Sequence, residues 1–265
     1  MTTLVLFDID GTILWTDGAG RRAIHTALRE IFGGIGPASY WFDGKTDRQI
    51  VRDLMRLEGH GDAPIDANMD ALLVRYVVYL ERELADPGHP LKLFDGVGRL
   101  LDALEARDDV LLGLLTGNLE AGARAKLRAV GIDPARFRAN AFGSDHEYRP
   151  ELPAIAQRRA SELLGAVLPG GSVVVIGDTP ADVECGRGIG ARAIAVATGR
   201  YGMEELAAHG PAAVFPDLTD TGAVVEAILT PRRGEAAAQA GPSRRAGAAP
   251  GDELPRPGAP PREPR

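Results

Sequence analysis

The feature that most constrains the fold lies at the start of the chain, where four apolar residues run directly into two aspartates. Residues 4–7 read Leu-Val-Leu-Phe without polar alternation, which is typical of a strand buried on both faces of a helix-covered parallel sheet. Asp8 and Asp10 follow two residues apart, so in an extended segment their side chains point to the same side. On these residues alone, a catalytic pair and an ordinary turn both fit the pattern.

Two further apolar runs, at residues 110–115 and 173–176, also end in polar side chains. Segments of helical periodicity separate the three runs, which predicts an α/β fold built on a doubly wound parallel sheet. The carboxyl ends of parallel strands meet at one edge of the sheet, where such sheets bind ligands. We therefore expect one site at this edge, formed by Asp8, Asp10, Thr116, Gly117, Asn118, Asp178 and Asp182.

Between the first strand and about residue 90, the pattern indicates helices and no strand. Apolar residues recur at helical spacing over residues 19–32, 47–57 and 66–84. A block of this length is too long for a connection inside the sheet. We therefore expect residues 16–90 to form an inserted all-helical subdomain. The expected core comprises residues 1–15 and 91–229.

Composition narrows the possible functions. A net charge of −7 argues against nucleic-acid binding, and no apolar stretch approaches the roughly 20 residues that span a membrane. The single cysteine, Cys185, excludes an internal disulfide, and no signal peptide is predicted. Residues 230–265, rich in Pro, Gly, Ala and Arg, are expected to be a disordered tail. These features favour a cytoplasmic protein with no membrane partner and leave its oligomeric state open.

The converging side chains are suited to phosphoryl transfer. Several aspartates around one point offer hard oxygen ligands, for which Mg²⁺ is the usual cation beside phosphate. The Thr116 hydroxyl and the free N–H groups of a helix starting near Leu119 suit an anion. A metal, an anion cradle and a free carboxylate are together the equipment for transfer through an aspartyl-phosphate.

Three segments resemble the signature motifs of the haloacid dehalogenase-like hydrolase superfamily, in the family's order. They are Asp8-Ile9-Asp10-Gly11-Thr12, Leu115-Thr116-Gly117-Asn118 and Gly177-Asp178-Thr179-Pro180-Ala181-Asp182. The likeness covers about residues 1–229 and is greatest to phosphoglycolate phosphatase-like members, which also share the segment Gly44-Lys45-Thr46-Asp47. It implies a Rossmann-like core, a helical cap over residues 16–90 and Mg²⁺-dependent hydrolysis of a small phosphorylated metabolite.

The resemblance also implies a role for each motif residue. Asp8 would be the nucleophile that attacks phosphorus, and Asp10 would protonate the leaving alcohol and then activate water. Lys45 would either meet an anionic substrate or be a solvated charge, as would Arg48. The phosphoryl oxygens would be held by Thr116, Gly117 and Asn118.

The resemblance assigns Mg²⁺ to Asp8, Asp178 and the backbone carbonyl of Asp10, with Asp182 binding directly or through water. A carboxyl group at position 10 favours a phosphatase. The alternatives are a phosphomutase of the same superfamily, which returns the phosphoryl group to a sugar, and a non-catalytic relative that binds phosphate or metal.

The chain departs from the family at the third motif, which usually supplies a lysine. The three lysines, Lys45, Lys92 and Lys126, fall in the cap, in the linker and inside the helix after Asn118, so none fits that position. Arg149 is the predicted replacement, although its planar fork differs from a compact ammonium group. A surface location for Arg149 is the alternative, and Arg158 and Arg159 are weaker candidates.

Trp15 lies at the predicted boundary between core and cap, and Trp41 lies inside the predicted cap. Trp15 and Trp41 either line the cleft between cap and core or pack within the cap, and the sequence favours packing.

Overall fold

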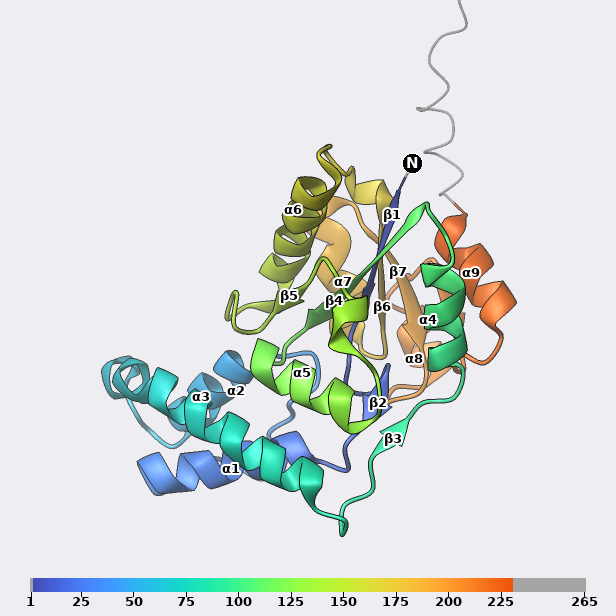
Figure 1. Cartoon of the computed structure of the whole chain (residues 1–265). Helices are drawn as coiled ribbons and strands as arrows, with labels where there is room; N and C mark the ends of the chain where they lie inside the picture. The colour runs from blue at the N-terminus through green and yellow to red at the C-terminus, as the bar shows by residue number, and fades with distance from the viewer. Residues whose placement is uncertain (1, 231–265) are drawn as a thin grey trace, which may run out of the picture. The chain divides into compact units, whose positions relative to one another are not determined.

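Six parallel strands form the sheet that positions the site, in the order β5-β4-β1-β6-β7-β8 (Figure 1). The structure is a computed structural model that describes residues 2–230; the predicted tail beyond Thr230 lies outside the described residues. β1 lies between β4 and β6, and each of these neighbours pairs with it in parallel. The strands are β1 (Thr3–Phe7), β4 (Val110–Thr116), β5 (Ala141–Phe142), β6 (Val173–Gly177), β7 (Arg192–Val196) and β8 (Ala213–Phe215).

Helices cover both faces of this sheet, because successive side chains of a strand point to opposite faces. Val5 and Phe7 pack against α4 (Val97–Glu105), α5 (Glu120–Ala129) and α9 (Thr221–Leu229). Leu4 and Leu6 pack on the other face, against α6 (Leu152–Leu164) and α7 (Pro180–Cys185). The short helix α8 (Met203–Ala207) lies beside β7 and β8. The predicted α/β, Rossmann-like fold is confirmed.

Three helices between β1 and β4 form a layer with an apolar core of its own (Figure 1). They are α1 (Ala19–Phe32), α2 (Asp47–Leu57) and α3 (Asp62–Ala85), which we call the helical insertion. The helix α3 begins four residues earlier than the sequence predicts, because Pro64 is tolerated in a first helical turn. The insertion leaves the core at β2 (Leu14–Trp15) and returns at β3 (Lys92–Leu93), two short antiparallel strands.

The short strand β2 corrects the prediction that the region between the first strand and about residue 90 contains no strand, and β3 follows just beyond that region. Each has only two residues, which is too short to show a hydrophobic period. Four 3₁₀ turns complete the described structure. They are η1 (Pro134–Arg136), η2 (Arg149–Glu151), η3 (Gly170–Ser172) and η4 (Gly186–Ile189).

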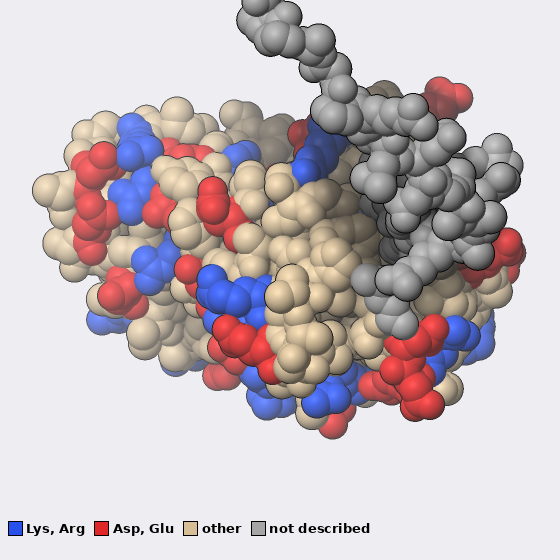
Figure 2. All heavy atoms as spheres, turned by 90° about the horizontal axis from the view of Figure 1, so that it is seen from above, with Lys and Arg blue, Asp and Glu red and all other residues tan. Residues whose placement is uncertain are grey.

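Charged side chains are interspersed over the described part of the face shown in Figure 2, where Lys and Arg residues alternate with Asp and Glu. Such a mixture produces no extended field of one sign on this face. Among the described residues, no helix is both long enough and apolar enough to cross a membrane.

Candidate active site

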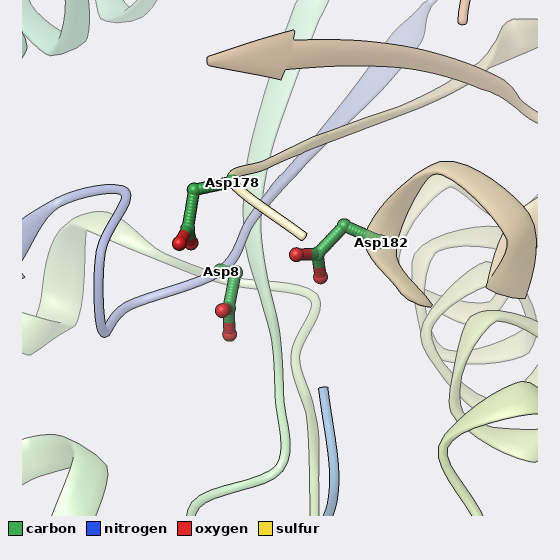
Figure 3. Close-up of side chains that lie close together, drawn as sticks. All are labelled: Asp8, Asp178 and Asp182. Carbon is green, nitrogen blue, oxygen red and sulfur yellow. The ribbon is translucent and has the colours of Figure 1, made fainter. Parts of the chain in front are cut away.

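Three buried carboxylates converge at the carboxyl edge of the sheet (Figure 3). Asp8 directly follows β1, Asp178 directly follows β6, and Asp182 lies in the first turn of α7. Their relative exposures are 7%, 5% and 1%, and one oxygen from each lies within 4.8 Å of the others. The three strands β4, β1 and β6 are neighbours in the sheet, which is why residues far apart in sequence meet here.

The electrostatics of this cluster favour a bound cation. Burial raises the pKa of Asp8 to about 6; Arg149 opposes this shift, and Asp182 and Asp10 add to it. Burial, followed by the charges of Asp182 and Asp8, also raises the pKa of Asp178. Crowded carboxylates with raised pKa values are neutralised when a cation binds between them. The donor set, all carboxylate oxygens, fits a hard divalent ion such as Mg²⁺.

Arg149 is the buried cation that faces this cluster. Its side chain is 5% exposed, and Nη2 lies 3.3 Å from Oδ1 of Asp8. The same nitrogen donates hydrogen bonds to the Asp182 carboxylate and to the Leu115 carbonyl. Its Nε has no hydrogen-bond partner within residues 2–230. By contrast, Arg158 is mostly exposed beside Glu162.

Asp182 is held by the protein on both oxygens, unlike the other two carboxylates. Oδ1 pairs with Arg149, and Oδ2 accepts hydrogen bonds from the backbone N–H and the hydroxyl of Thr179. The Thr179 hydroxyl in turn accepts from the Asp182 N–H, which completes a capping box at the start of α7. Asp8 and Asp178 are therefore the better placed of the three to contact a metal directly.

Asp10 turns away from the cluster into a second polar group. Its carboxylate accepts hydrogen bonds from Nζ of Lys126, at 2.8 and 2.6 Å, and from Nδ2 of Asn118, at 2.7 Å. Lys126 also donates to Oδ1 of Asn118 at 2.6 Å, which closes a triangle of three side chains. Asn118 Nδ2 donates in addition to the Thr116 hydroxyl.

Lys126 is a site residue that the sequence analysis considers only for the third-motif position and assigns no other role. In the structure Lys126 is 3% exposed and lies beside Asp10, whereas Arg149 is the cation beside Asp8. The sequence offers a weak signal, since the small residues Gly122 and Ala123 lie one turn earlier on the same face of the helix. Its position relative to Asp10, however, depends on how α5 packs across the end of β1.

Two N–H groups at the start of α5 have protein partners, which corrects in part the expectation of free N–H groups near Leu119. The Leu119 N–H donates to Oδ2 of Asp47 at 2.8 Å, and the Glu120 N–H donates to the Ser144 hydroxyl at 3.3 Å. Asp47 belongs to α2 of the helical insertion and is 6% exposed. Burial raises its pKa to about 6, although Lys126 opposes the shift.

Gly117 allows the insertion to approach the core this closely. Its carbonyl accepts a hydrogen bond from the Asp47 N–H at 2.8 Å. A Cβ at Gly117 would lie 2.0 Å from the carbonyl oxygen of Lys45, so any larger residue would push the insertion away. Thr46, which caps α2, donates its hydroxyl to the Glu147 carbonyl of the core.

A cavity of about 800 Å³ lies between the insertion and the carboxyl edge of the sheet. Asp8, Asp10 and Asp178 line its inner end, together with Thr116, Gly117, Asn118, Lys126 and Arg149. Lys45 lines the insertion side and donates to the Trp41 carbonyl at 3.0 Å, whereas Arg48 pairs with Asp70 on the insertion. Trp15 and Trp41 also line the cavity, so the favoured prediction that they pack within the cap is wrong.

The fold and this arrangement of carboxylates match a known family. The family model of haloacid dehalogenase-like hydrolases matches residues 2–190. The chain belongs to the haloacid dehalogenase-like hydrolase family.

Relatives and solved structures agree with this assignment. A protein described as "Probable phosphatase IndB" from Dickeya dadantii is 27% identical over 239 residues, which cover 86% of this chain and 96% of that protein. A hydrolase from Pseudomonas syringae superposes with a TM-score of 0.66 at 22% identity, covering 87% of this chain and all of the other. A predicted phosphoglycolate phosphatase from Haemophilus somnus gives 0.61 at 19% identity, covering 84% and 98%.

Proposed function

We propose that this hydrolase is a Mg²⁺-dependent phosphatase that cleaves a phosphate monoester through an aspartyl-phosphate on Asp8. The observation that carries the proposal is the position of Asp8, which lies in one cluster with the Asp178 and Asp182 carboxylates and 3.3 Å from Nη2 of Arg149. Asp10, two residues after Asp8, lines the same cavity but does not belong to the cluster of three carboxylates. One nucleophile, one acid/base and one charge-compensating cation are the groups that this chemistry needs.

In the first step, a carboxylate oxygen of Asp8 attacks phosphorus, and the bond from phosphorus to the alcohol oxygen breaks. Asp10, as the general acid, gives a proton to the departing oxygen. The Thr116 hydroxyl and the Arg149 guanidinium, which both line the cavity, would hold the phosphoryl oxygens.

In the second step, Asp10 takes a proton from a water molecule that attacks the phosphorus of the aspartyl-phosphate. The bond between Asp8 and phosphorus breaks, which releases inorganic phosphate and restores the Asp8 carboxylate. Asn118 and Lys126 hold the Asp10 side chain in one orientation throughout, through the hydrogen bonds described above.

Asp8, Asp178 and the backbone carbonyl of Asp10 would hold Mg²⁺. Asp182 lies beside them and is itself held by hydrogen bonds from Arg149 and Thr179. When bound, the ion supplies positive charge that offsets the anionic nucleophile and the phosphoryl oxygens.

Mg²⁺ is expected to stabilise the protein in a pH-dependent way. The pKa of Asp8 in the metal-free fold is raised to about 6, so its contribution to stability is fully present at low pH and is lost as the pH rises through 6. Mg²⁺ binds the ionised carboxylates, so its stabilising effect should grow over the same range. At about 100 times its Kd, the gain is about 2.7 kcal/mol. Thermal unfolding with MgCl₂ at about pH 5 and about pH 8 measures this effect. NaCl at matched ionic strength is the control, and an equal shift at both pH values would contradict the metal site.

The test of the function itself is release of inorganic phosphate from p-nitrophenyl phosphate in the presence of Mg²⁺, with loss of activity on chelation. Conversion of a hexose 1-phosphate to its 6-phosphate without phosphate release would show a phosphomutase instead. If the protein binds phosphate specifically but hydrolyses no phosphate ester, it is a non-catalytic relative.

We further propose that the helical insertion, within residues 16–90, acts as a mobile cap on the core of residues 1–15 and 91–229. The paired strands β2 and β3 are its two connections to the core. The contacts across the cleft, from Asp47 to Leu119 and from Arg52 to Glu147, then belong to the closed state. Closure excludes bulk water from the aspartyl-phosphate.

Loss of the Arg52–Glu147 ion pair is expected to weaken closure. The pair is mostly buried, with side-chain exposures of 14% and 18%, and its nitrogen and oxygen lie 2.6 Å apart. Glu147→Gln should raise KM about 5- to 30-fold with a smaller change in kcat, which corresponds to about 1–2 kcal/mol of substrate-linked closure. Asp70→Asn, which breaks an exposed ion pair inside the insertion, is the matched control. Unchanged KM in Glu147→Gln would show that this pair is not part of closure.

A further inference from the structure

Both tryptophans of the chain stand half-exposed in the wall of the active-site cavity. Trp15 is 49% exposed and Trp41 is 55% exposed, although indole is the largest side chain and gains most from burial. Trp15 belongs to β2, on the connection to the insertion, and Trp41 precedes α2. Exposed apolar groups that gather around a cleft mark a binding surface.

The indole of Trp41 is held in place rather than left free. The Arg200 guanidinium lies over its ring, 3.5 Å from the centroid, and Arg200 also pairs with Asp43 at 3.5 Å. Because the guanidinium lies over one face of the indole, a ligand ring that stacks on Trp41 would use the other face. Phe42 beside it is fixed in the same way by Arg21, at 3.9 Å from the ring centroid.

The cavity is divided by chemistry. Asp8, Asp10, Asp178 and Arg149 line it at the edge of the sheet. The rest of the wall combines the aromatic residues Trp15, Trp41, Phe42 and Phe94 with the charged residues Arg21, Lys45, Lys92 and Arg200. A volume of about 800 Å³ lies in the upper part of the range of roughly 300–1,000 Å³ that encloses drug-sized ligands. A phosphate ester of a two- or three-carbon acid would leave most of this aromatic wall uncovered.

We propose that the substrate is a phosphate monoester whose alcohol carries a flat aromatic or heteroaromatic ring, which stacks on Trp41 while the phosphate lies against Asp8. The proposal rests on the phosphatase function and narrows its substrate class. A flat ring gains from offset stacking on an indole face, and a saturated ring of the same carbon number does not.

Binding of ligands that cannot be hydrolysed tests this directly, because Trp15 and Trp41 are the only two tryptophans in the chain and their fluorescence reports on the cavity. Benzylphosphonate and cyclohexylmethylphosphonate have the same carbon number and cannot be hydrolysed. Benzylphosphonate should quench the tryptophan emission and bind about 10-fold more tightly, as expected for one stacked ring. In Trp41→Leu the two affinities should become equal, whereas Trp15→Phe should keep the preference. Equal affinities in the unaltered protein would overturn the proposal.

Kinetics supply the second test. Benzyl phosphate should be hydrolysed with a kcat/KM about 10-fold above that of cyclohexylmethyl phosphate. Trp41→Leu should remove this advantage, so that the two esters have equal kcat/KM. Tyr79→Leu, which removes an aromatic ring from the insertion outside the cavity, is the matched control. Equal kcat/KM for the two esters would overturn the substrate class and leave the phosphatase intact. Tighter benzylphosphonate binding without hydrolysis of any ester would support the ligand class and overturn the phosphatase function.

Discussion

Replacement of Asp8 by asparagine is expected to abolish turnover, with a fall in kcat of at least about 10⁴-fold, because it removes the attacking oxygen. Asparagine has nearly the same size, so the substitution leaves the packing of this buried position intact. It also removes one of the crowded negative charges and should not destabilise the metal-free fold above pH 6, where the Asp8 carboxylate is ionised. Phosphate release and thermal unfolding, measured together, check both statements.

Asp10→Asn is the companion variant that distinguishes covalent catalysis from direct hydrolysis. With p-nitrophenyl phosphate the leaving group needs no proton, so the first step should continue while the second stops. A burst of p-nitrophenol and a protein species heavier by one phosphoryl group should follow. Asp70→Asn, on the exposed surface of α3, should behave as the unaltered enzyme. Full activity in Asp8→Asn, or steady turnover without a covalent species in Asp10→Asn, would contradict the mechanism.

Arg149→Ala is expected to lower both the stability of the protein and its turnover. It leaves the Asp8 and Asp182 carboxylates buried without the cation that faces them, which costs about 3–5 kcal/mol of unfolding free energy. It also removes a positive charge from the transition state, so kcat should fall about 10²- to 10³-fold. Denaturant unfolding and steady-state kinetics at saturating Mg²⁺ measure the two losses separately.

Arg149→Lys restores the charge but cannot reproduce the guanidinium contacts with Asp8, Asp182 and the Leu115 carbonyl together. It should therefore recover much of the stability and only part of the turnover. Arg158→Ala, a mostly exposed arginine on α6, should change neither property. Unimpaired turnover in Arg149→Ala would remove this residue from the mechanism.

Features that depend on adjacent residues could be predicted from the sequence, whereas contacts between distant parts of the chain could not. Buried strands are visible in the sequence because four or five adjacent apolar residues determine them locally, and β1, β4 and β6 were predicted on that basis. The order of parallel strands then dictates that Asp8 and Asp178 meet at one edge. The cap that Thr46 provides at the start of α2 is a local feature of the same kind, because a cap is a contact within a few residues.

Contacts between layers were not readable in this way. The hydrogen bonds of Lys126 to Asp10 and of Asp47 to the Leu119 N–H join residues that are 116 and 72 positions apart. They depend on how α5 crosses the end of β1 and how closely the insertion lies on the core. No periodicity encodes that placement, so the sequence did not reveal that Lys126 contacts Asp10 or that Asp47 accepts from the Leu119 N–H.

The opening run of four apolar residues and two aspartates was therefore sufficient to determine a buried strand with a carboxylate pair at its end. Which carboxylate faces which cation was decided only by tertiary structure. Asp8 lies beside Arg149 at the centre of the sheet edge, and Asp10 turns to Lys126 under the insertion. Local sequence determines the direction of a side chain along a strand, whereas its partner depends on the packing of elements that the strand does not contain.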